Sequence, residues 1–205
     1  MRYGEMDFAC GLSRKKGSLR RIGNAEVNIL LLAAMSSGMI SREAAFSICG
    51  SQKSFSKVIP ELKKKKEAEI VYGTSPRMFH ILSKGCERIE ALVPGAVEAQ
   101  KANRMSKGMP QRKYDISMAL YLLQIAGGQI IPIRKPPLVL EDKILEPDVP
   151  EGEMLVYGPL EFKKLHPDEM HGSRIAALAM KKDRVCVFYY MGGRNIRYQE
   201  AVERR

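Results

Sequence analysis

The stretch that begins at Ser41 contains the pattern that most restricts how this chain can fold. Two short segments with helical periodicity meet at Gly50, and an N-cap serine precedes each of them, Ser41 the first and Ser51 the second. The second segment has apolar residues on one side and Lys, Gln and Ser on the other. Two strand-like segments, 68–72 and 77–82, follow with turn residues between them, so we expect a β-hairpin directly after the second helix.

One helix precedes this pattern and another follows it. Asn24 has an N-cap side chain, and the apolar residues after it recur at the spacing of a helix face: Val27, Leu30, Leu31 and Ala34. This helix is predicted to end near residues 36–38. Ser83 is expected to cap a fourth helix over 84–92. The predicted order is therefore three helices, a hairpin and a helix.

Four pieces of sequence characterise this unit: Ile40-Ser41-Arg42-Glu43-Ala44, the helix over 58–65, Glu69-Ile70-Val71-Tyr72, and Phe79-His80-Ile81-Leu82-Ser83-Lys84-Gly85. Residues 24–92 thereby resemble the winged-helix DNA-binding family, in which a Leu-Ser/Thr-x-Gly step after the wing is common. The resemblance implies that the helix after Ser51 enters the major groove and that the hairpin is the wing. Pro60 departs from the pattern, because a proline inside a helix costs about 3 kcal/mol. The helix is therefore either kinked at Pro60 or begins later.

The net charge of +11 comes entirely from the first half of the chain. Residues 1–113 contain 21 Lys and Arg against 10 Asp and Glu, whereas residues 114–205 contain 13 of each. Lys and Arg gain affinity for nucleic acid by releasing its condensed counterions, so a basic half favours a polyanionic partner. Ordinary solubilising surface is the alternative interpretation.

The charge and the resemblance together predict a protein that binds double-stranded DNA in a sequence-specific way. Its role would be transcriptional regulation, or DNA handling in a plasmid or other mobile element. The candidate DNA-binding residues lie on the helix after Ser51, at the hairpin and in a basic flexible arm over 1–23. They are Gln52, Lys53, Ser54, Ser56, Lys57, Arg77, Arg14, Lys15, Lys16, Arg20 and Arg21.

A linker and a second domain follow. Residues 93–111 are basic, lack a sustained apolar face and are predicted to be the linker. Residues 112–205 predict a small mixed α/β domain: a helix over 112–126, strands over 129–134, 154–157 and 160–164, and an antiparallel meander over 175–180, 184–190 and 195–199. The fold class predicted for the whole chain is α+β. In the meander, 184–190 is expected to be a central strand buried on both faces.

Pro147-Asp148 followed by Glu161-Phe162-Lys163 resembles the PD-(D/E)-x-K nuclease family of mobile-element proteins. The resemblance implies that Asp148, Glu161 and Lys163 are catalytic and that Asp148 and Glu161 hold Mg²⁺ or Mn²⁺. Strand alternation would place Glu161 and Lys163 on one face. Two interpretations compete with an active nuclease: a degenerate nuclease-like scaffold, and solvated surface charge. In both, no metal or other cofactor is expected, so the sequence leaves open whether the chain is an enzyme.

Other classes are excluded by what the sequence lacks. It has no nucleophile elbow, phosphate-binding loop, dinucleotide fingerprint or zinc-protease motif, and its four cysteines form no C-x-x-C pair. No apolar run is long enough to span a bilayer, so we expect a cytoplasmic protein without a membrane partner. A third possible function is an adaptor or inhibitor that binds a partner protein through residues 112–205. The helix over 112–126 is apolar enough to form a homodimer.

Overall fold

The computed structural model of this chain describes residues 22–72, 77–97, 110–140, 143–144, 146–162 and 175–189. These residues form a mixed α+β fold of helices and small antiparallel sheets, which confirms the expected α+β class. Within these ranges no helix combines the length and the apolar character needed to cross a bilayer.

The first half folds in the predicted order. Its elements are α1 (Ile22–Met35), β1 (Met39–Ser41), α2 (Arg42–Cys49), α3 (Gln52–Lys64), β2 (Ala68–Val71), β3 (Met78–Ile81) and α4 (Ser83–Leu92). The hairpin after α3 is confirmed, because β2 pairs with β3 in antiparallel register. The short strand β1 pairs with the other edge of β3, so the sheet order is β1-β3-β2.

The predicted caps of α2 and α3 are confirmed. The Ser41 hydroxyl accepts a hydrogen bond from the Ala44 N–H, and the Ser51 hydroxyl accepts one from the Ser54 N–H. Gly50 ends α2 in the left-handed region at φ 70°, where glycine avoids the steric penalty of a side chain. The helix α3 runs through Pro60 to Lys64, so it neither begins after the proline nor ends there.

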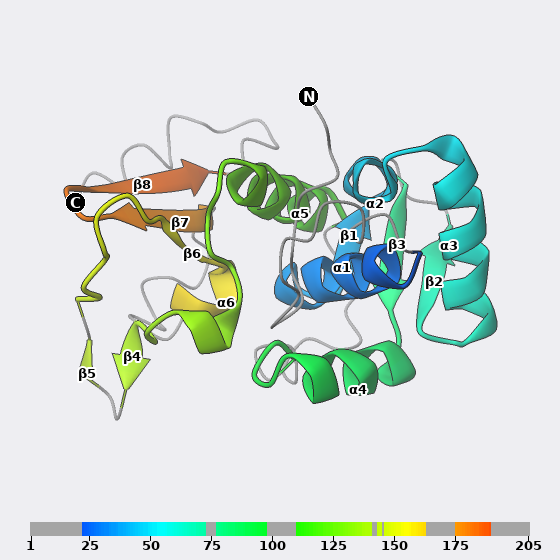
Figure 1. The fold of residues 1–205 in the computed structure, drawn as a ribbon, viewed down its shortest axis with the longest axis horizontal. Helices are drawn as coiled ribbons and strands as arrows, with labels where there is room; N and C mark the ends of the chain where they lie inside the picture. Colours follow the sequence, from blue (N-terminus) through cyan, green and yellow to red (C-terminus); the bar gives the residue numbers. More distant parts are fainter. Residues whose placement is uncertain are drawn as a thin grey trace.

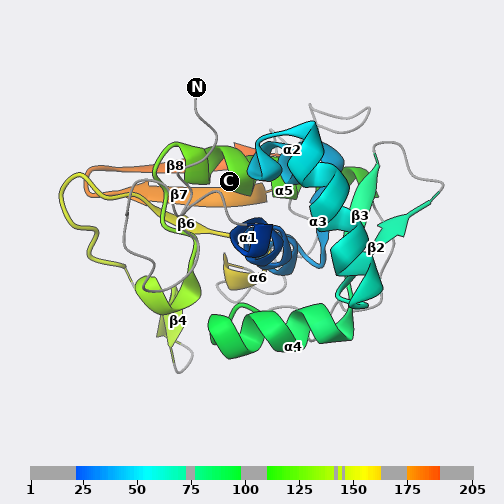
Figure 2. The ribbon, with the colours of Figure 1, turned by 45° about the vertical axis from the view of Figure 1, so that its right-hand side comes forward.

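The helix α1 lies at the centre of the molecule. Its side chains from Ile29 to Ala34 are almost completely buried, in contact with residues of α2, α3, α4 and α5 in one apolar cluster. Figure 2 shows α1 nearly end-on, with α4 below it and α3 to its right. A helix that is apolar on all sides is stable only when it is covered on all sides, and this position meets that requirement.

The second half contributes one long helix and two sheets. Its elements are α5 (Pro110–Ile125), the 3₁₀ turn η2 (Pro132–Arg134), β4 (Val139–Leu140), β5 (Lys143–Ile144), β6 (Leu155–Tyr157), α6 (Pro159–Phe162), β7 (Ile175–Lys181) and β8 (Arg184–Tyr189). The strands β6, β7 and β8 form an antiparallel sheet in that order, and the predicted β7–β8 hairpin is confirmed. The expected strand over 195–199 lies outside the described residues.

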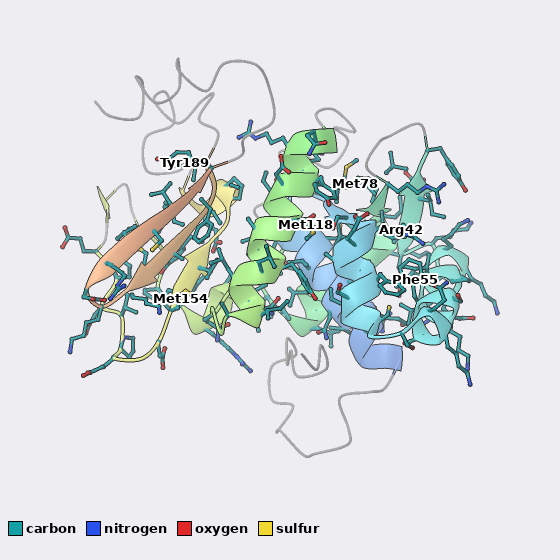
Figure 3. The ribbon with its side chains drawn as sticks, turned by 90° about the horizontal axis from the view of Figure 1, so that it is seen from above. Arg42, Phe55, Met78, Met118, Met154 and Tyr189 are labelled. Atoms are coloured by element: carbon teal, nitrogen blue, oxygen red, sulfur yellow. The ribbon has the colours of Figure 1, made fainter. Side chains whose placement is uncertain are left out.

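The helix α5 connects the two halves. Figures 1 and 3 show it between the β6–β8 sheet and the helices α1 to α3. Its residues Ile116, Leu120 and Leu123 belong to the same buried cluster as α1. Tyr114 packs against Met39, Val71 and Met78, which form a second cluster on the β1-β3-β2 sheet.

The division of the chain into an arm, a DNA-binding domain, a linker and a second domain stays a prediction. What the structure adds is that the core is continuous across the expected boundaries. Val93, Ala96 and Val97, from the expected linker, are buried in the central cluster together with residues of α1 and α5.

Two predicted strands are wrong. Residues 129–134 form a single parallel bridge from Gln129 to Leu155 and then the turn η2, because Pro132 has no N–H to donate to a ladder. Residues 159–162 form the helical turn α6. There the Glu161 carboxylate accepts a hydrogen bond from the Gly158 N–H, which is one half of a capping box, and the Glu161 N–H donates to the Gly158 carbonyl.

The expectation for β8 is also wrong. Among the described strands, β8 lies at the edge of its sheet instead of in its centre, and Val185, Val187 and Tyr189 are exposed. The continuous apolar residues of β8 therefore do not indicate a strand that is buried on both faces. The side chain of Phe188, by contrast, packs against the central cluster.

Gly85 has a steric role in placing α4. The helix begins at Ser83 with Leu82 as its N-cap, so the expected cap at Ser83 is wrong by one residue and no side chain caps it. Leu82 N–H donates to the Glu67 carbonyl, which brings the first turn of α4 against this backbone. A Cβ atom at Gly85 would lie 2.3 Å from the Glu67 carbonyl oxygen. Only glycine fits this approach of helix to strand.

We expect Gly85→Ala to destabilise the fold by about 2 kcal/mol, because an overpacking cost of about 3 kcal/mol exceeds the roughly 1 kcal/mol that alanine gains in helix propensity. Ser83→Ala, in the same helical turn, is the matched control and should change stability by less than about 0.5 kcal/mol. Urea unfolding of both variants measures the difference. Equal midpoints would show that α4 can move away from Glu67 without cost.

Candidate nucleic-acid interface

The outward face of α3 is basic. Its exposed residues are Gln52, Lys53, Ser56, Lys57, Pro60, Lys63 and Lys64, which recur at the spacing of one helix face. The only acid of α3, Glu61, is half-buried. The inward face is fully apolar, because Phe55, Val58, Ile59 and Leu62 are buried. The structure thus presents a strip of four lysines on α3 without a carboxylate in it.

Four of the five α3 residues expected to bind DNA lie together on this face: Gln52, Lys53, Ser56 and Lys57. The Gln52 side-chain amide donates to the Ser56 hydroxyl over 3.1 Å, so these two side chains are held together one turn apart. Ser54, the fifth, is half-buried, and its N–H is taken by the cap at Ser51. Ser54 therefore takes part in the N-terminal cap of α3 and does not belong to its exposed face.

Aromatic rings fix the angle at which α3 leaves α2. Phe55 of α3 lies with its ring centroid 5.6 Å from that of Phe46 in α2 and 5.9 Å from that of Phe79 in β3. The second pair is edge-to-face, the arrangement that aromatic quadrupoles favour. The three rings join α2, α3 and the sheet in one contact.

Two arginines, Arg42 and Arg77, lie where the start of α2 contacts the hairpin. Arg77, a predicted DNA-binding residue, is exposed, and its carbonyl accepts a hydrogen bond of 3.1 Å from the Arg42 N–H. The Arg42 guanidinium lies 5.5 Å from the centroid of the Phe55 ring, a cation–π arrangement that Figure 3 shows at the α3 end of the molecule. Sequence reasoning missed Arg42. Its position directly after the Ser41 cap places it on the α3 side of the sheet.

The remaining candidates for DNA contact lie outside the described residues. They are the arm residues Arg14, Lys15, Lys16, Arg20 and Arg21.

The C-terminal end of α3 is held by a charge network. Glu26 of α1, whose side chain is only 5% exposed, receives Lys65 at 2.8 Å and Arg88 of α4 at 2.9 Å. Arg88 also contacts Glu67 at 2.7 Å. Burial acts to lower the pKa of Arg88, but the hydrogen bonds and charges of Glu26 and Glu67 outweigh it and raise that pKa. Lys65 is thus ion-paired with Glu26, although its own side chain is 42% exposed.

Glu26→Ala is expected to destabilise the fold by about 2 kcal/mol. This is less than the roughly 3–5 kcal/mol for losing one partner of a fully buried pair, because Arg88 keeps Glu67 and Lys65 reaches water. The control is Glu151→Ala, since Glu151 forms an exposed 3.6 Å pair with Lys182. That change should cost less than about 1 kcal/mol. If both variants unfold at the same urea concentration, the network does not hold α3.

The proposed nuclease residues are not brought together as a strand motif. Asp148 is exposed in the segment before β6, Glu161 lies in the turn α6, and Lys163 lies outside the described residues. Among the described residues no group of three or more His, Cys, Asp and Glu side chains is placed to hold a metal ion. Glu161 lies in α6 instead of the strand expected over 160–164, and the nuclease resemblance itself stays a prediction.

The Glu161 carboxylate instead pairs with a buried lysine. Its two oxygens lie 2.8 and 2.9 Å from the Lys135 ammonium, whose side chain is 1% exposed. Lys135 also donates to the Val156 carbonyl and lies 4.5 Å from the centroid of the Tyr157 ring. Burial lowers the pKa of Lys135, while the Glu161 charge and hydrogen bond act to raise it. Burial, with the Glu161 charge, raises the pKa of Tyr157 to about 12.

We expect Glu161→Gln to cost about 3 kcal/mol of stability, because it leaves the Lys135 charge buried without its counter-charge. Asp148→Asn is the matched control, since it neutralises the other predicted catalytic carboxylate at an exposed position. It should change stability by less than about 0.5 kcal/mol. Thermal unfolding of the two variants separates these outcomes. A Glu161→Gln protein as stable as the wild type would restore Glu161 as a group available for catalysis.

Comparisons with known protein families, with curated proteins and with solved structures found no match.

Proposed function

We propose that this chain binds double-stranded DNA through a winged helix made of α1 to α4 and the β1-β3-β2 sheet. The proposal is supported by the order of the elements, in which a helix, a short strand, two helices and a hairpin follow one another. In this family the second helix of the helix-turn-helix enters the major groove. That helix is α3, and the hairpin β2–β3 is the wing.

The outward face of α3 is the observation that carries the proposal. A strip of Lys53, Lys57, Lys63 and Lys64, free of exposed acids, suits the phosphate backbone on both sides of a groove. Gln52 and Ser56 lie near the helix N-terminus, from which helices of this class contact base edges. Lysines that bind phosphate set affinity and position, while the shorter polar side chains set the sequence that is recognised.

The packing behind α3 supports the same function. A helix that reads base edges needs a fixed orientation, because hydrogen bonds to bases tolerate little displacement. The rings of Phe46, Phe55 and Phe79 hold its first turns, and the pair of Glu26 with Lys65 holds its last. The backbone of α3 is thus held in a fixed orientation, from which the side chains proposed to face DNA extend.

The biological role that we propose is sequence-specific regulation of transcription or DNA handling in a mobile element. The arm residues Arg14 to Arg21 would add contacts with the backbone or the minor groove. The metal-dependent nuclease, the adaptor function of residues 112–205 and the homodimer stay predictions, since no described contact favours them.

The double variant Lys53→Gln with Lys57→Gln should weaken binding to a random-sequence duplex. The slope of log K against log salt should become shallower by about 0.9 for each phosphate that the variant no longer neutralises. Lys182→Gln is the control, because it removes an exposed lysine in the β7–β8 turn, far from α3. Fluorescence anisotropy over a range of salt concentrations measures both variants.

Two results would contradict the proposal. One is a wild-type affinity that does not change with salt, because the basic face would then have no electrostatic role. The other is an equal decrease of affinity in the α3 variant and in Lys182→Gln, which would place the lysines that bind DNA elsewhere. Selection of duplexes from a random pool tests sequence specificity, and recovery of no consensus would reject that part.

A further inference from the structure

A pocket of about 440 Å³ lies between α3 and the end of the hairpin where its connecting loop begins. Phe55 and Ile59 of α3 form one wall, and Ile70 and Phe79 of the sheet form another. Volumes of about 300–1,000 Å³ are those in which proteins hold small organic molecules. The pocket is therefore large enough for a ligand of one or two rings.

The pocket is apolar inside and cationic at its edge. Arg42 and Arg77 both line it, and none of the described lining residues carries a carboxylate. Among the described residues, neither guanidinium forms a salt bridge within the protein. Tyr72, which is 79% exposed, also lines the pocket and supplies a further ring.

The two arginines are held close together. The backbone hydrogen bond from Arg42 to Arg77 joins the start of α2 to the start of β3. The Arg42 guanidinium is placed against the Phe55 ring, so it stands above the apolar wall instead of pointing freely into water. A guanidinium presents a planar fork of donors that matches the oxygens of a carboxylate or a phosphate.

We propose that this pocket binds a small planar ring that carries one anionic group. The ring would lie against the apolar lining that Phe55, Ile59 and Phe79 provide, where aromatic faces and edges give favourable contacts. Its carboxylate or phosphate would face Arg42 and Arg77. A free aromatic carboxylate and a mononucleotide share this chemistry, so either source fits the pocket.

This site goes beyond the proposed function, because it adds a small ligand to a DNA-binding surface. The pocket lies between α3 and the hairpin, the two elements proposed to contact DNA. A bound anion would neutralise Arg42 and Arg77 and so oppose binding of the phosphate backbone. The ligand would act as an effector that releases the protein from DNA.

The test is titration calorimetry of the full chain without DNA, so that a failure of ligand binding is separate from a failure of DNA binding. The probes are naphthoate, thymidine monophosphate and the neutral naphthalene methanol. We expect one of the two anions to bind at least tenfold more tightly than the neutral probe. Binding of naphthoate alone identifies a free carboxylate as the ligand class, and binding of the nucleotide alone identifies a nucleotide. If neither anion binds, or if the neutral probe binds equally well, the proposal is overturned.

Variants locate the binding. Arg42→Gln with Arg77→Gln should reduce the affinity for the anion at least tenfold, and Ile59→Phe should reduce it by filling the pocket. Lys84→Gln, an exposed lysine of α4, is the matched control and should bind as the wild type does. Circular dichroism checks that each variant is folded. Unchanged affinity in the arginine variant, which alters two residues outside the core, would overturn the proposal even if Ile59→Phe fails to fold.

Discussion

The burial of α1 is the constraint on which the rest of the structure depends. From Ile29 to Ala34 this helix has almost no exposed surface, and it is covered by elements from both halves of the chain. The helices α2, α3 and α4 provide part of that cover, and α5 provides another part. Because an apolar helix cannot leave one side in water without cost, the two halves share one core. The basic first half and the neutral second half differ in charge, but they do not have separate interiors.

This shared core explains why a basic surface forms on α3. The apolar side of α3 packs against α1 and the sheet. The lysines on its opposite side are therefore exposed to solvent, where a polyanion could bind them. Glu26 adds a directional restraint, since its buried carboxylate fixes Lys65 and Arg88 at once. The same packing leaves a pocket beside the loop end of the hairpin, lined by Arg42, Arg77 and apolar side chains. The surface that we propose for DNA and the pocket that we propose for a small anion thus depend on one arrangement of α3 and the hairpin.

The second half shows that a residue of a short motif can also have a structural role. Glu161 matches the acid of a nuclease signature in the sequence, but in the structure it caps α6 and neutralises Lys135. A carboxylate already bonded to a buried ammonium and to a backbone N–H has few lone pairs left for a metal ion. The sequence did contain a signal for this, because Gly-Pro-Leu-Glu resembles a capping box as much as it resembles part of a strand.

Local chemistry determined what could be predicted from the sequence alone. The caps at Ser41 and Ser51, the end of α2 at Gly50, the hairpin after α3 and the helix over 112–126 depend on residues close together in the chain, and each was predicted. The pairing of Glu26 with Arg88, of Glu161 with Lys135, and of Arg42 with the Phe55 ring was not. Nor was the exposure of β8, because an apolar run has the same pattern at the edge of a sheet as at its centre. These features were decided by tertiary structure, since a charge or an apolar strand takes its partner from residues that only folding brings near.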